Sequence, residues 1–420
     1  MTTDTSDPIG TGVVIGIDID SVNLASLDYW QSGKVHDGLA ALRRERPVSW
    51  HEHPDSGKGF WSVVRHADIA EINNNSDDFS NRDGVRVNHD PEMALVRMGS
   101  GAMLEMDPPV HTSYRKTVSK GWSPRAVRRH EDIIRERSRR IIDGIASKGG
   151  CEFISEAAAV LPLHVICDIV GVPDGAERDM VFELVNRSLG ENDPDVSTGP
   201  EYGSEAVGEL RAYGQALAQK RINDPRDDMV TYLVNATVDD RPLTPEEIGG
   251  YFSMLIAAGN ETTRNAISYG LMGFSEFPEQ RALLISRPDL SMAMAEEVVR
   301  WATPLMHMRR TVTRDTVFRG IKMREGDKLA MWYISANRDE AIFADPLVFD
   351  ITRDPNRHQA FGGGGPHFCL GGNLGRLEIM VFFEELFARL PDIHVVGEPK
   401  ALRSNQFRGV LDLRVEYTPN

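Results

Sequence analysis

The pattern of apolar and polar residues predicts a mainly α-helical chain with small β-sheets. Residues 110–270 carry mostly helical spacing, and further helices are predicted at 66–74, 291–301 and 371–390. Runs rich in strand-forming residues predict strands at 48–51, 60–64, 307–313, 317–319, 321–323 and 328–333. Residues 81–107 show neither pattern, and a segment of that length is typical of a functional loop.

The clearest helix begins at Thr244. The sequence Thr244-Pro-Glu-Glu247 is a capping box with Pro at the first helical position. Apolar residues then follow at helical spacing from Ile248 to Leu271, and Pro278 ends the pattern. At about 1.5 Å per residue, this helix would be roughly 45 Å long, which is enough to cross the whole molecule.

Composition argues against a nucleic-acid-binding, a disulfide-rich or a membrane-spanning protein. The chain has 420 residues and a net charge of −16, which disfavours nucleic acid and anionic membranes as partners. Three cysteines cannot form a disulfide framework, and the N-terminus lacks the features of a signal peptide. No run of apolar residues is long enough to span a bilayer, so we expect a soluble cytoplasmic protein without integral membrane contact. No repeat or low-complexity linker divides the chain, which predicts a lead-in over residues 1–23 and one domain over residues 24–420.

The sharpest local motif is Phe361-Gly-Gly-Gly-Gly-Pro-His-Phe-Cys369-Leu-Gly371. Consecutive glycines let a backbone approach a bulky group closely, because no Cβ stands in the way. Cys369 precedes a predicted helix, whose N-terminus would lower the pKa of its thiol and favour a thiolate that binds a soft metal or haem iron. A mobile glycine loop beside an inert cysteine is the alternative. A zinc site is a weaker one, because it needs more Cys or His ligands nearby.

A second motif lies inside the long helix, at Ala258-Gly259-Asn-Glu261-Thr262-Thr263. Gly and polar residues inside a helix lower its stability, and Gly alone is about 1 kcal/mol less favourable than Ala. A buried acid and hydroxyl need hydrogen-bond partners or a functional role. One such role is a proton relay from Glu261 and Thr262 to a bound small molecule. A polar stripe that faces solvent is the alternative.

Two further patterns pair charges at helical spacing. Glu297 and Arg300 can form a bidentate ion pair, with Arg353 following later in the chain. His111 and Arg115 share a helix face, and Arg310 follows Arg309 in the segment of the predicted strand 307–313. The latter groups could hold a carboxylate or phosphate, although each could equally be ordinary surface charge.

In order and spacing, these motifs resemble the cytochrome P450 family from about Leu24 to Tyr417. The resemblance implies the P450 fold as a single haem domain, with haem b (iron protoporphyrin IX) as cofactor. It is strongest to soluble bacterial members that oxidise terminal carbons of methyl-branched lipids and of sterol or terpenoid side chains. The segments that carry this similarity are residues 255–266, 307–315 and 361–369.

The resemblance also implies a role for each matching residue. Cys369 would be the thiolate ligand of the iron, and Glu261 and Thr262 the catalytic acid–alcohol pair that handles protons at bound dioxygen. Ala258 and Gly259 would lie against the haem face, and Phe361 would pack near the sulfur. The haem propionates would be bound by His111, Arg115, Arg310 and His367. Glu297, Arg300 and Arg353 match a structural triad. One departure is that Phe361 precedes Cys369 by eight residues, whereas the family's aromatic usually stands seven before, so how Phe361 packs is open.

The substrate pocket should be apolar. Its candidate lining residues, mostly methionines that adapt to flexible aliphatic chains, are Met98, Met103, Leu104, Met254, Leu305, Met306 and Met308. Methionines in such positions can also belong to the hydrophobic core without contacting a substrate. We expect a monooxygenase that inserts one oxygen atom of dioxygen into a C–H bond of a lipophilic substrate, with terminal hydroxylation favoured.

Electrons would come from NAD(P)H through a ferredoxin reductase and a ferredoxin, because no length remains for a flavin module. Residues 115–140 hold ten Lys or Arg against three acids, a local balance of +7 that could steer an acidic ferredoxin. A solvated helix face is the alternative. Two rival functions are a peroxide-driven enzyme of the same fold and a non-catalytic haem or lipid binder. The Glu261–Thr262 pair argues against both.

Overall fold

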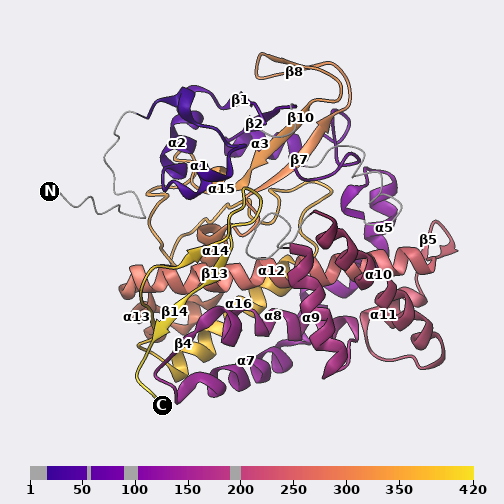
Figure 1. Ribbon diagram of the computed structural model, residues 1–420, viewed down its shortest axis with the longest axis vertical. Coiled ribbons are helices and arrows are strands. Elements are labelled where there is room, and N and C mark those ends of the chain that lie inside the picture. The colour runs from indigo at the N-terminus through magenta and orange to yellow at the C-terminus, as the bar shows by residue number, and fades with distance from the viewer. Residues whose placement is uncertain (1–16, 54–57, 89–102, 190–199) are drawn as a thin grey trace.

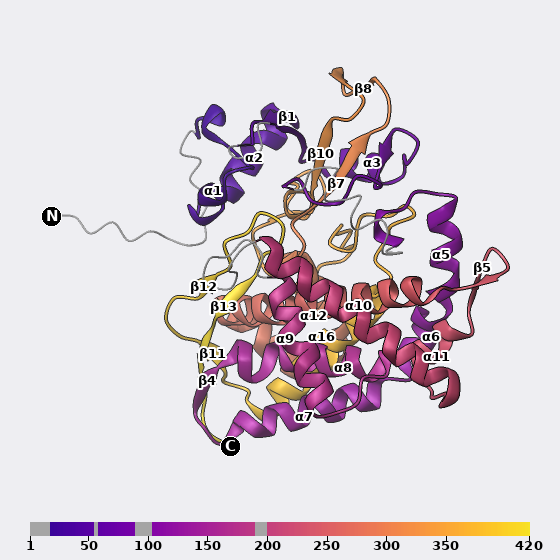
Figure 2. The ribbon, with the colours of Figure 1, turned by 45° about the vertical axis from the view of Figure 1, so that its right-hand side comes forward.

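The computed structural model describes residues 17–53, 58–88, 103–189 and 200–420. Its longest element is the predicted helix, α12 (Pro245–Glu276), whose 32 residues span roughly 48 Å. Both capping-box bonds are present at Thr244, which is the N-cap. In both views α12 lies between the largest sheet and the main group of helices (Figures 1 and 2).

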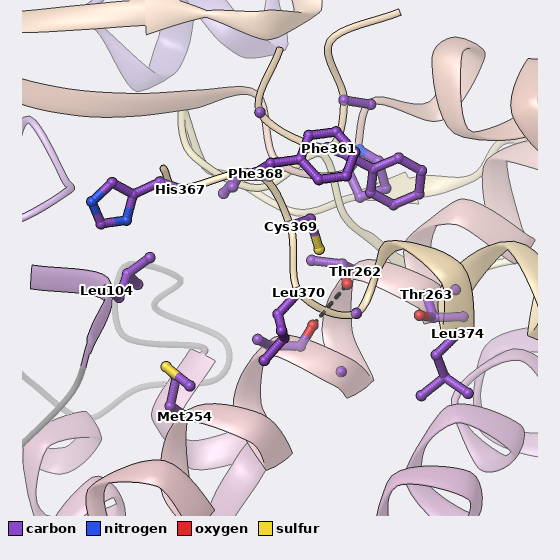
Figure 3. A pocket seen from close by; sticks show the side chains of 18 of the residues that line it. Leu104, Met254, Thr262, Thr263, Phe361, His367, Phe368, Cys369, Leu370 and Leu374 are labelled. Carbon is purple, nitrogen blue, oxygen red and sulfur yellow. Dashed lines mark hydrogen bonds between the residues drawn. The ribbon is translucent and has the colours of Figure 1, made fainter. Parts of the chain in front are cut away.

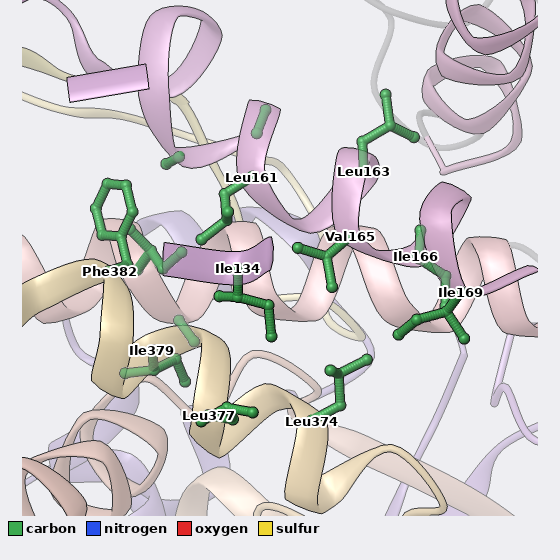
Figure 4. Packing of buried hydrophobic residues seen from close by; sticks show 14 of the residues in the cluster. Ile134, Leu161, Leu163, Val165, Ile166, Ile169, Leu374, Leu377, Ile379 and Phe382 are labelled. Carbon is green, nitrogen blue, oxygen red and sulfur yellow. The ribbon is translucent and has the colours of Figure 1, made fainter. Parts of the chain in front are cut away.

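The helices on one side of α12 form the main hydrophobic core. α7 (Glu131–Ala146), α8 (Val160–Val170), α10 (Pro200–Asn223), α14 (Ser291–Ala302) and α16 (Gly372–Arg389) pack against α12 or against one another. Figure 4 shows side chains from α7, α8 and α16 meeting, among them Ile134, Leu161, Val165 and Leu377. Each such Leu or Ile contributes about 1.5–3 kcal/mol when fully buried.

The largest sheet joins strands from residues 48–80 with strands from residues 307–332. Its strand order is β1-β2-β10-β7-β3. These strands are β1 (Val48–His51), β2 (Phe60–Val63), β10 (Lys328–Trp332), β7 (His307–Val312) and β3 (Phe79–Ser80). β2 and β10 are parallel, and the other neighbours are antiparallel. The strands predicted from the sequence in this region are all present, within a residue at each end.

The remaining elements are short. The other helices are α1 (Leu27–Gln31), α2 (Val35–Glu45), α3 (His66–Asn73), α5 (Val110–Ser119), α6 (Pro124–Arg128), α9 (Ala176–Leu189), α11 (Met229–Val234), α13 (Pro278–Ser286) and α15 (Tyr333–Ala336). A π-helical turn, Ile154–Ala158, precedes α8, and the 3-10 turns are Ile19–Ser21, Met103–Glu105, Lys120–Trp122 and Pro288–Leu290. The other strands are β4 (Gly150–Glu152), β5 (Thr237–Val238), β6 (Arg241–Pro242), β8 (Thr316–Phe318), β9 (Ile321–Met323), β11 (His394–Val395), β12 (Lys400–Ala401), β13 (Val410–Asp412) and β14 (Arg414–Glu416). The predicted fold class, mainly α with small sheets, is confirmed.

The predicted triad is formed in the core beside α14. Both carboxylate oxygens of Glu297 accept from Arg300 at 2.7 Å, and neither side chain is exposed. Arg353 reaches the same carboxylate at 3.4 Å. Arg300 also donates to the backbone carbonyls of Asn337, Pro346 and Val348, so this ion pair fixes a long loop to α14. Among the residues described, no helix has both the length and the apolarity that crossing a bilayer requires.

Candidate functional site

The site is a cavity between α12 and the loop that carries Cys369. α5, β7 and the start of α16 supply its other walls. Figure 3 shows the sulfur of Cys369 directed from the loop toward α12 and Thr262. The cavity therefore brings together segments that lie more than 250 residues apart in the sequence, from His111 to Cys369.

The glycine run shapes the loop before the cysteine. Gly362, Gly363, Gly364 and Gly365 all have positive φ angles, of 99°, 62°, 104° and 73°. A Cβ at Gly365 would come within 2.0 Å of a backbone oxygen of α3, so glycine is required there for close approach as well as for conformation. The Cys369 N–H donates to the Phe361 carbonyl at 2.8 Å, which closes the loop. The Cys369 side chain is exposed only toward the cavity.

The electrostatic environment of the thiol differs from the sequence prediction. Burial raises the pKa of the Cys369 thiol above its ordinary value. The backbone N–H groups of Gly371 and Gly372, at the start of α16, oppose this rise in pKa, as do the charges of Arg115 and Arg376. The predicted effect of the helix N-terminus is thus present. Burial acts in the opposite direction on the pKa of this thiol.

The packing of Phe361, left open by the sequence, is determined by Arg376 on α16. The Arg376 guanidinium lies 4.2 Å from the centre of the Phe361 ring. Its Nε donates to Glu296 at 2.7 Å, and His358 contacts the other oxygen of that carboxylate at 2.8 Å. Phe361 lines the cavity beside Cys369 and is held by a cation–π contact, despite the extra glycine that follows it.

One edge of the cavity gathers four nitrogen-bearing side chains, for which no ion pair with an acid is found in the described part of the chain. His111, Arg115, Arg310 and His367 all line it, and the two imidazole rings lie 4.0 Å apart. His111 Nδ1 and His367 Nε2 are buried without a hydrogen-bond partner among the described residues. Burial, together with the neighbouring cations, lowers the pKa of His111 to about 4 and that of His367 to about 2. Burial likewise lowers the pKa of Arg310. This edge is suited to bind carboxylates.

The α12 wall carries the second sequence motif. Ala258, Gly259, Thr262 and Thr263 line the cavity, as the resemblance implied for the first three. The Thr262 hydroxyl donates to the Ala258 carbonyl at 2.8 Å, the bond drawn in Figure 3. A Cβ at Gly259 would lie 3.2 Å from Ile166 of α8, so this glycine also lets the two helices approach.

Of the predicted acid–alcohol pair, only Thr262 lines the cavity. Its carboxylate is buried, forms an ion pair with Arg264 and accepts from Asn265 Nδ2 at 2.9 Å. The residue is absent from the cavity wall, whereas its neighbour Thr262 is part of it. The helical turn explains the difference, because successive residues point about 100° apart around the axis. The structure thus places Thr262 on the cavity wall and Glu261 one residue away, beside Arg264 and Asn265, and the relay through this pair stays a prediction.

Most of the predicted substrate-pocket residues line the cavity. They are Met103, Leu104, Met254, Leu305 and Met308. Met98 lies outside the described residues. Met306 is a wrong prediction, because it is buried in a separate core with Val22, Leu24 and Trp332. The backbone between Leu305 and β7 is irregular, so side-chain alternation does not carry across it.

Several cavity residues had no sequence signal that could single them out. They include Asn81, Trp122, Ile166, Thr263, Ala266, Tyr333, Leu374 and Glu378. Thr263 adjoins the predicted motif and could have been found from it. Glu378 follows the cysteine by nine residues, at a helical position that looks like ordinary amphipathic sequence.

Comparison with known proteins identifies the family. The family model described as Cytochrome P450 matches residues 288–392, which hold both Glu297 and Cys369. The chain is 40% identical over 414 residues to a methyl-branched lipid omega-hydroxylase of Mycobacterium tuberculosis, covering 96% of each protein. The chain belongs to the cytochrome P450 family. It is thus a P450 monooxygenase, and the family's cofactor is haem.

Other relatives agree with this assignment. A steroid C26-monooxygenase of Rhodococcus jostii is 38% identical over 398 residues, covering 93% of this P450 and 83% of the relative. The structure of Mycobacterium marinum cytochrome P450 CYP268A2 in complex with pseudoionone superposes with a TM-score of 0.88 at 36% identity. That alignment covers 94% of this chain and 98% of the other. The predicted resemblance to bacterial P450s that act on branched lipids and sterol side chains is confirmed.

The cavity of this P450 fits haem. A single thiol faces it from one wall, and a thiolate is a known ligand of haem iron. Haem also carries two propionate groups, and the edge formed by His111, Arg115, Arg310 and His367 offers nitrogen groups to bind them, among which His111 Nδ1 and His367 Nε2 are buried without a hydrogen-bond partner among the described residues. The remaining walls are mainly apolar, as a porphyrin face requires.

Proposed function

We propose that this P450 hydroxylates a terminal carbon of a lipophilic, methyl-branched chain or of a terpenoid or sterol side chain. Dioxygen would supply the oxygen atom, and NAD(P)H would supply electrons through a ferredoxin reductase and a ferredoxin. The observation that carries this proposal is that three methionines, Met103, Met254 and Met308, line the cavity. Thioether side chains adapt to flexible aliphatic groups. The two relatives, a methyl-branched lipid omega-hydroxylase and a steroid C26-monooxygenase, support the same substrate class.

The proposal gives each part of the cavity wall a role. Haem, when bound, supplies the redox chemistry that reduces dioxygen and oxidises carbon. Cys369 would hold its iron, and His111, Arg115, Arg310 and His367 would bind its propionates. Thr262 holds a hydroxyl proton at Oγ1, on the wall that faces the sulfur. Leu104, Leu305 and the methionines exclude water and position an alkyl chain over this hydroxyl.

Substrate class and regiochemistry are tested by a panel of matched lipids. Purified P450 is given NADPH, a ferredoxin system and isotopically labelled dioxygen, with straight-chain and methyl-branched fatty acids of equal length and a sterol with an intact side chain. We expect labelled oxygen in a terminal hydroxyl, with the branched chain turned over fastest. Mass spectrometry of the products checks both points. Oxidation confined to the middle of the chains, or product unlabelled by dioxygen, would contradict the proposal.

Apart from Arg115, which lines the cavity, the basic residues of the run 115–140 fall into two groups in the structure. Four arginines of α7 form ion pairs: Arg135 with Glu131, Glu384 and Glu385, Arg137 with Asp168 and Asp174, Arg139 with Glu385, and Arg140 with Glu136. The exposed cations of α5, α6 and their connection, for which no ion pair is found in the described part of the chain, are Lys116, Lys120, Arg125, Arg128 and Arg129. α6 packs against α16, which begins just after Cys369. We propose this smaller group as the docking surface for an acidic ferredoxin.

Charge reversal tests the docking surface. The double variant Arg128→Glu, Arg129→Glu is expected to slow reduction by ferredoxin about tenfold at low ionic strength, because opposite charges steer association. The difference should shrink as added salt screens the charges. Arg403→Glu, which alters an exposed cation paired with Asp28, is the matched control and should reduce at the native rate. Stopped-flow reduction across a salt series makes the comparison. Reduction that is insensitive to both salt and charge reversal would exclude this surface.

A further inference from the structure

Two arginines meet in the protein interior, away from the haem cavity. Arg338, which follows α15, and Arg408 both donate to the carbonyl oxygen of Trp301 near the end of α14, at 2.8 and 2.7 Å. Two positive charges therefore converge on one atom. Neither arginine is among the residues of the cavity wall. For neither of them is an ion pair with an acid found within residues 17–53, 58–88, 103–189 and 200–420.

The helix α2 adds two more nitrogen-bearing side chains. His36 and Arg43 stand seven residues apart, so they share a face of this helix. Arg43 donates to the Ser335 hydroxyl at 2.9 Å, which fixes that face against α15. Burial lowers the pKa of His36 well below its ordinary value, and the charges of Arg338 and Arg408 lower it further. We call His36, Arg43, Arg338 and Arg408 the interior basic cluster.

Three acids in the neighbouring segments are already bound. Glu340 forms an ion pair with Arg43 at 2.7 Å. Glu297 is bound by the two arginines of the structural triad. Asp339 accepts from two backbone N–H groups, at 2.9 and 3.0 Å. In the described part of the chain, the two arginines at the end of α14 thus have no acid that balances their charge, and a guanidinium does not lose its proton in proteins.

The end of α14 explains only part of this arrangement. The C-terminus of a helix carries partial negative charge, which stabilises nearby cations and accounts for one nitrogen of each arginine. Arg338 is 2% exposed, and its Nε and Nη1 are buried without a hydrogen-bond partner among the described residues, as is His36 Nδ1. Buried N–H groups without an acceptor are costly, above all on a charged side chain. Such groups are suited to an acceptor that carries negative charge.

We propose that the interior basic cluster binds a small monovalent anion of the halide type, such as chloride, between Arg338, Arg408 and His36. A monovalent anion is favoured over phosphate, because the cost of taking an ion out of water rises steeply with its charge. His36 and Arg408 are only partly buried, so the cluster reaches the surface on their side. The bound ion would hold α2 against the end of α14, just before the cavity-wall residues Pro304 and Leu305. The proposal does not depend on the substrate or on the reaction.

Anomalous diffraction tests the position of the ion. Crystals of the haem-loaded protein, grown without halide, are soaked in sodium bromide, because bromide takes the place of chloride and is identified by its anomalous signal. We expect bromide within hydrogen-bond distance of Arg338 and Arg408. Water at this position, or the absence of an anomalous signal there, would overturn the proposal.

Urea unfolding tests binding in solution. An ion that binds only the folded protein raises the free energy of unfolding as its concentration rises. At constant ionic strength, replacing gluconate by chloride should therefore raise the urea midpoint of the native protein. Arg338→Gln and Arg408→Gln should each at least halve this shift, because Gln keeps an N–H donor for the Trp301 carbonyl but has no charge. Urea is used because guanidinium chloride would itself supply the ion.

The matched control is Arg46→Gln. Arg46 follows the same helix, α2, and pairs with Asp20 at the surface. This variant should keep the full chloride shift, which separates binding at the cluster from a general effect of salt. If Arg338→Gln does not fold, the half-buried Arg408 carries the test alone. A native chloride shift in Arg408→Gln, no shift in the native protein, or bromide in the crystal without a shift in solution, which means binding at crystal concentration only, would each contradict the proposal.

Discussion

Cys369→Ser is expected to abolish monooxygenase turnover and the strongly red-shifted Soret band of the reduced, carbon monoxide-treated protein. Only a thiolate donates enough electron density to haem iron to give this spectrum, and a serine hydroxyl is a harder and far less acidic ligand. The loop itself should persist, because its closing bond runs between the backbone groups of Cys369 and Phe361. The variant should therefore fold and bind haem with altered ligation.

The matched control is another cysteine of the same chain. Cys151 lies in β4, is not among the residues of the cavity wall, and is half-buried. Cys151→Ser should keep both the red-shifted band and turnover. Absorption spectra of the two variants, taken with chemical reductant and carbon monoxide, decide the matter. A native red-shifted band in Cys369→Ser would show that another group holds the iron.

Glu297→Ala is expected to lower the free energy of unfolding by about 3–5 kcal/mol, because it leaves a charged group buried without its partner. Arg300 and Glu297 are both fully buried and joined by two bonds of 2.7 Å. The same carboxylate accepts the Asp350 N–H at 2.9 Å and Asn356 Nδ2 at 3.0 Å. The substitution removes the acceptor that holds the loop carrying Asp350 and Asn356. It also leaves the charge of Arg300 buried without its carboxylate partner.

Urea unfolding followed by circular dichroism measures this loss, with Asp20→Ala as the control. Asp20 pairs with Arg46 at the surface, where both side chains are largely exposed. Exposed ion pairs add little to stability, so the control should unfold at nearly the native denaturant concentration. Equal midpoints for the two variants would mean that the buried pair does not stabilise the fold.

Local sequence accounts for much of this P450. The capping box at Thr244, the strand at Val48–His51 and the helix after Cys369 were predictable because each depends on residues close together in the chain. The shape of the glycine run before Cys369 also depends on local sequence, because residues without a side chain adopt positive φ angles readily. The site residues that these motifs named, apart from Glu261, line one cavity.

Long-range packing decided the rest. The parallel pairing of β2 with β10, the burial of Met306 in a separate core, and the pairing of the α7 arginines with acids on α16 depend on segments far apart in sequence. The acids near the cavity are the clearest case. Glu261 adjoins Thr262 in sequence, but its carboxylate pairs with Arg264 outside the cavity wall, whereas Glu378, 116 residues after Thr262, lines the cavity. A motif determines which chemical groups are near one another along the backbone, and only the packing of helices determines which of them face the same space.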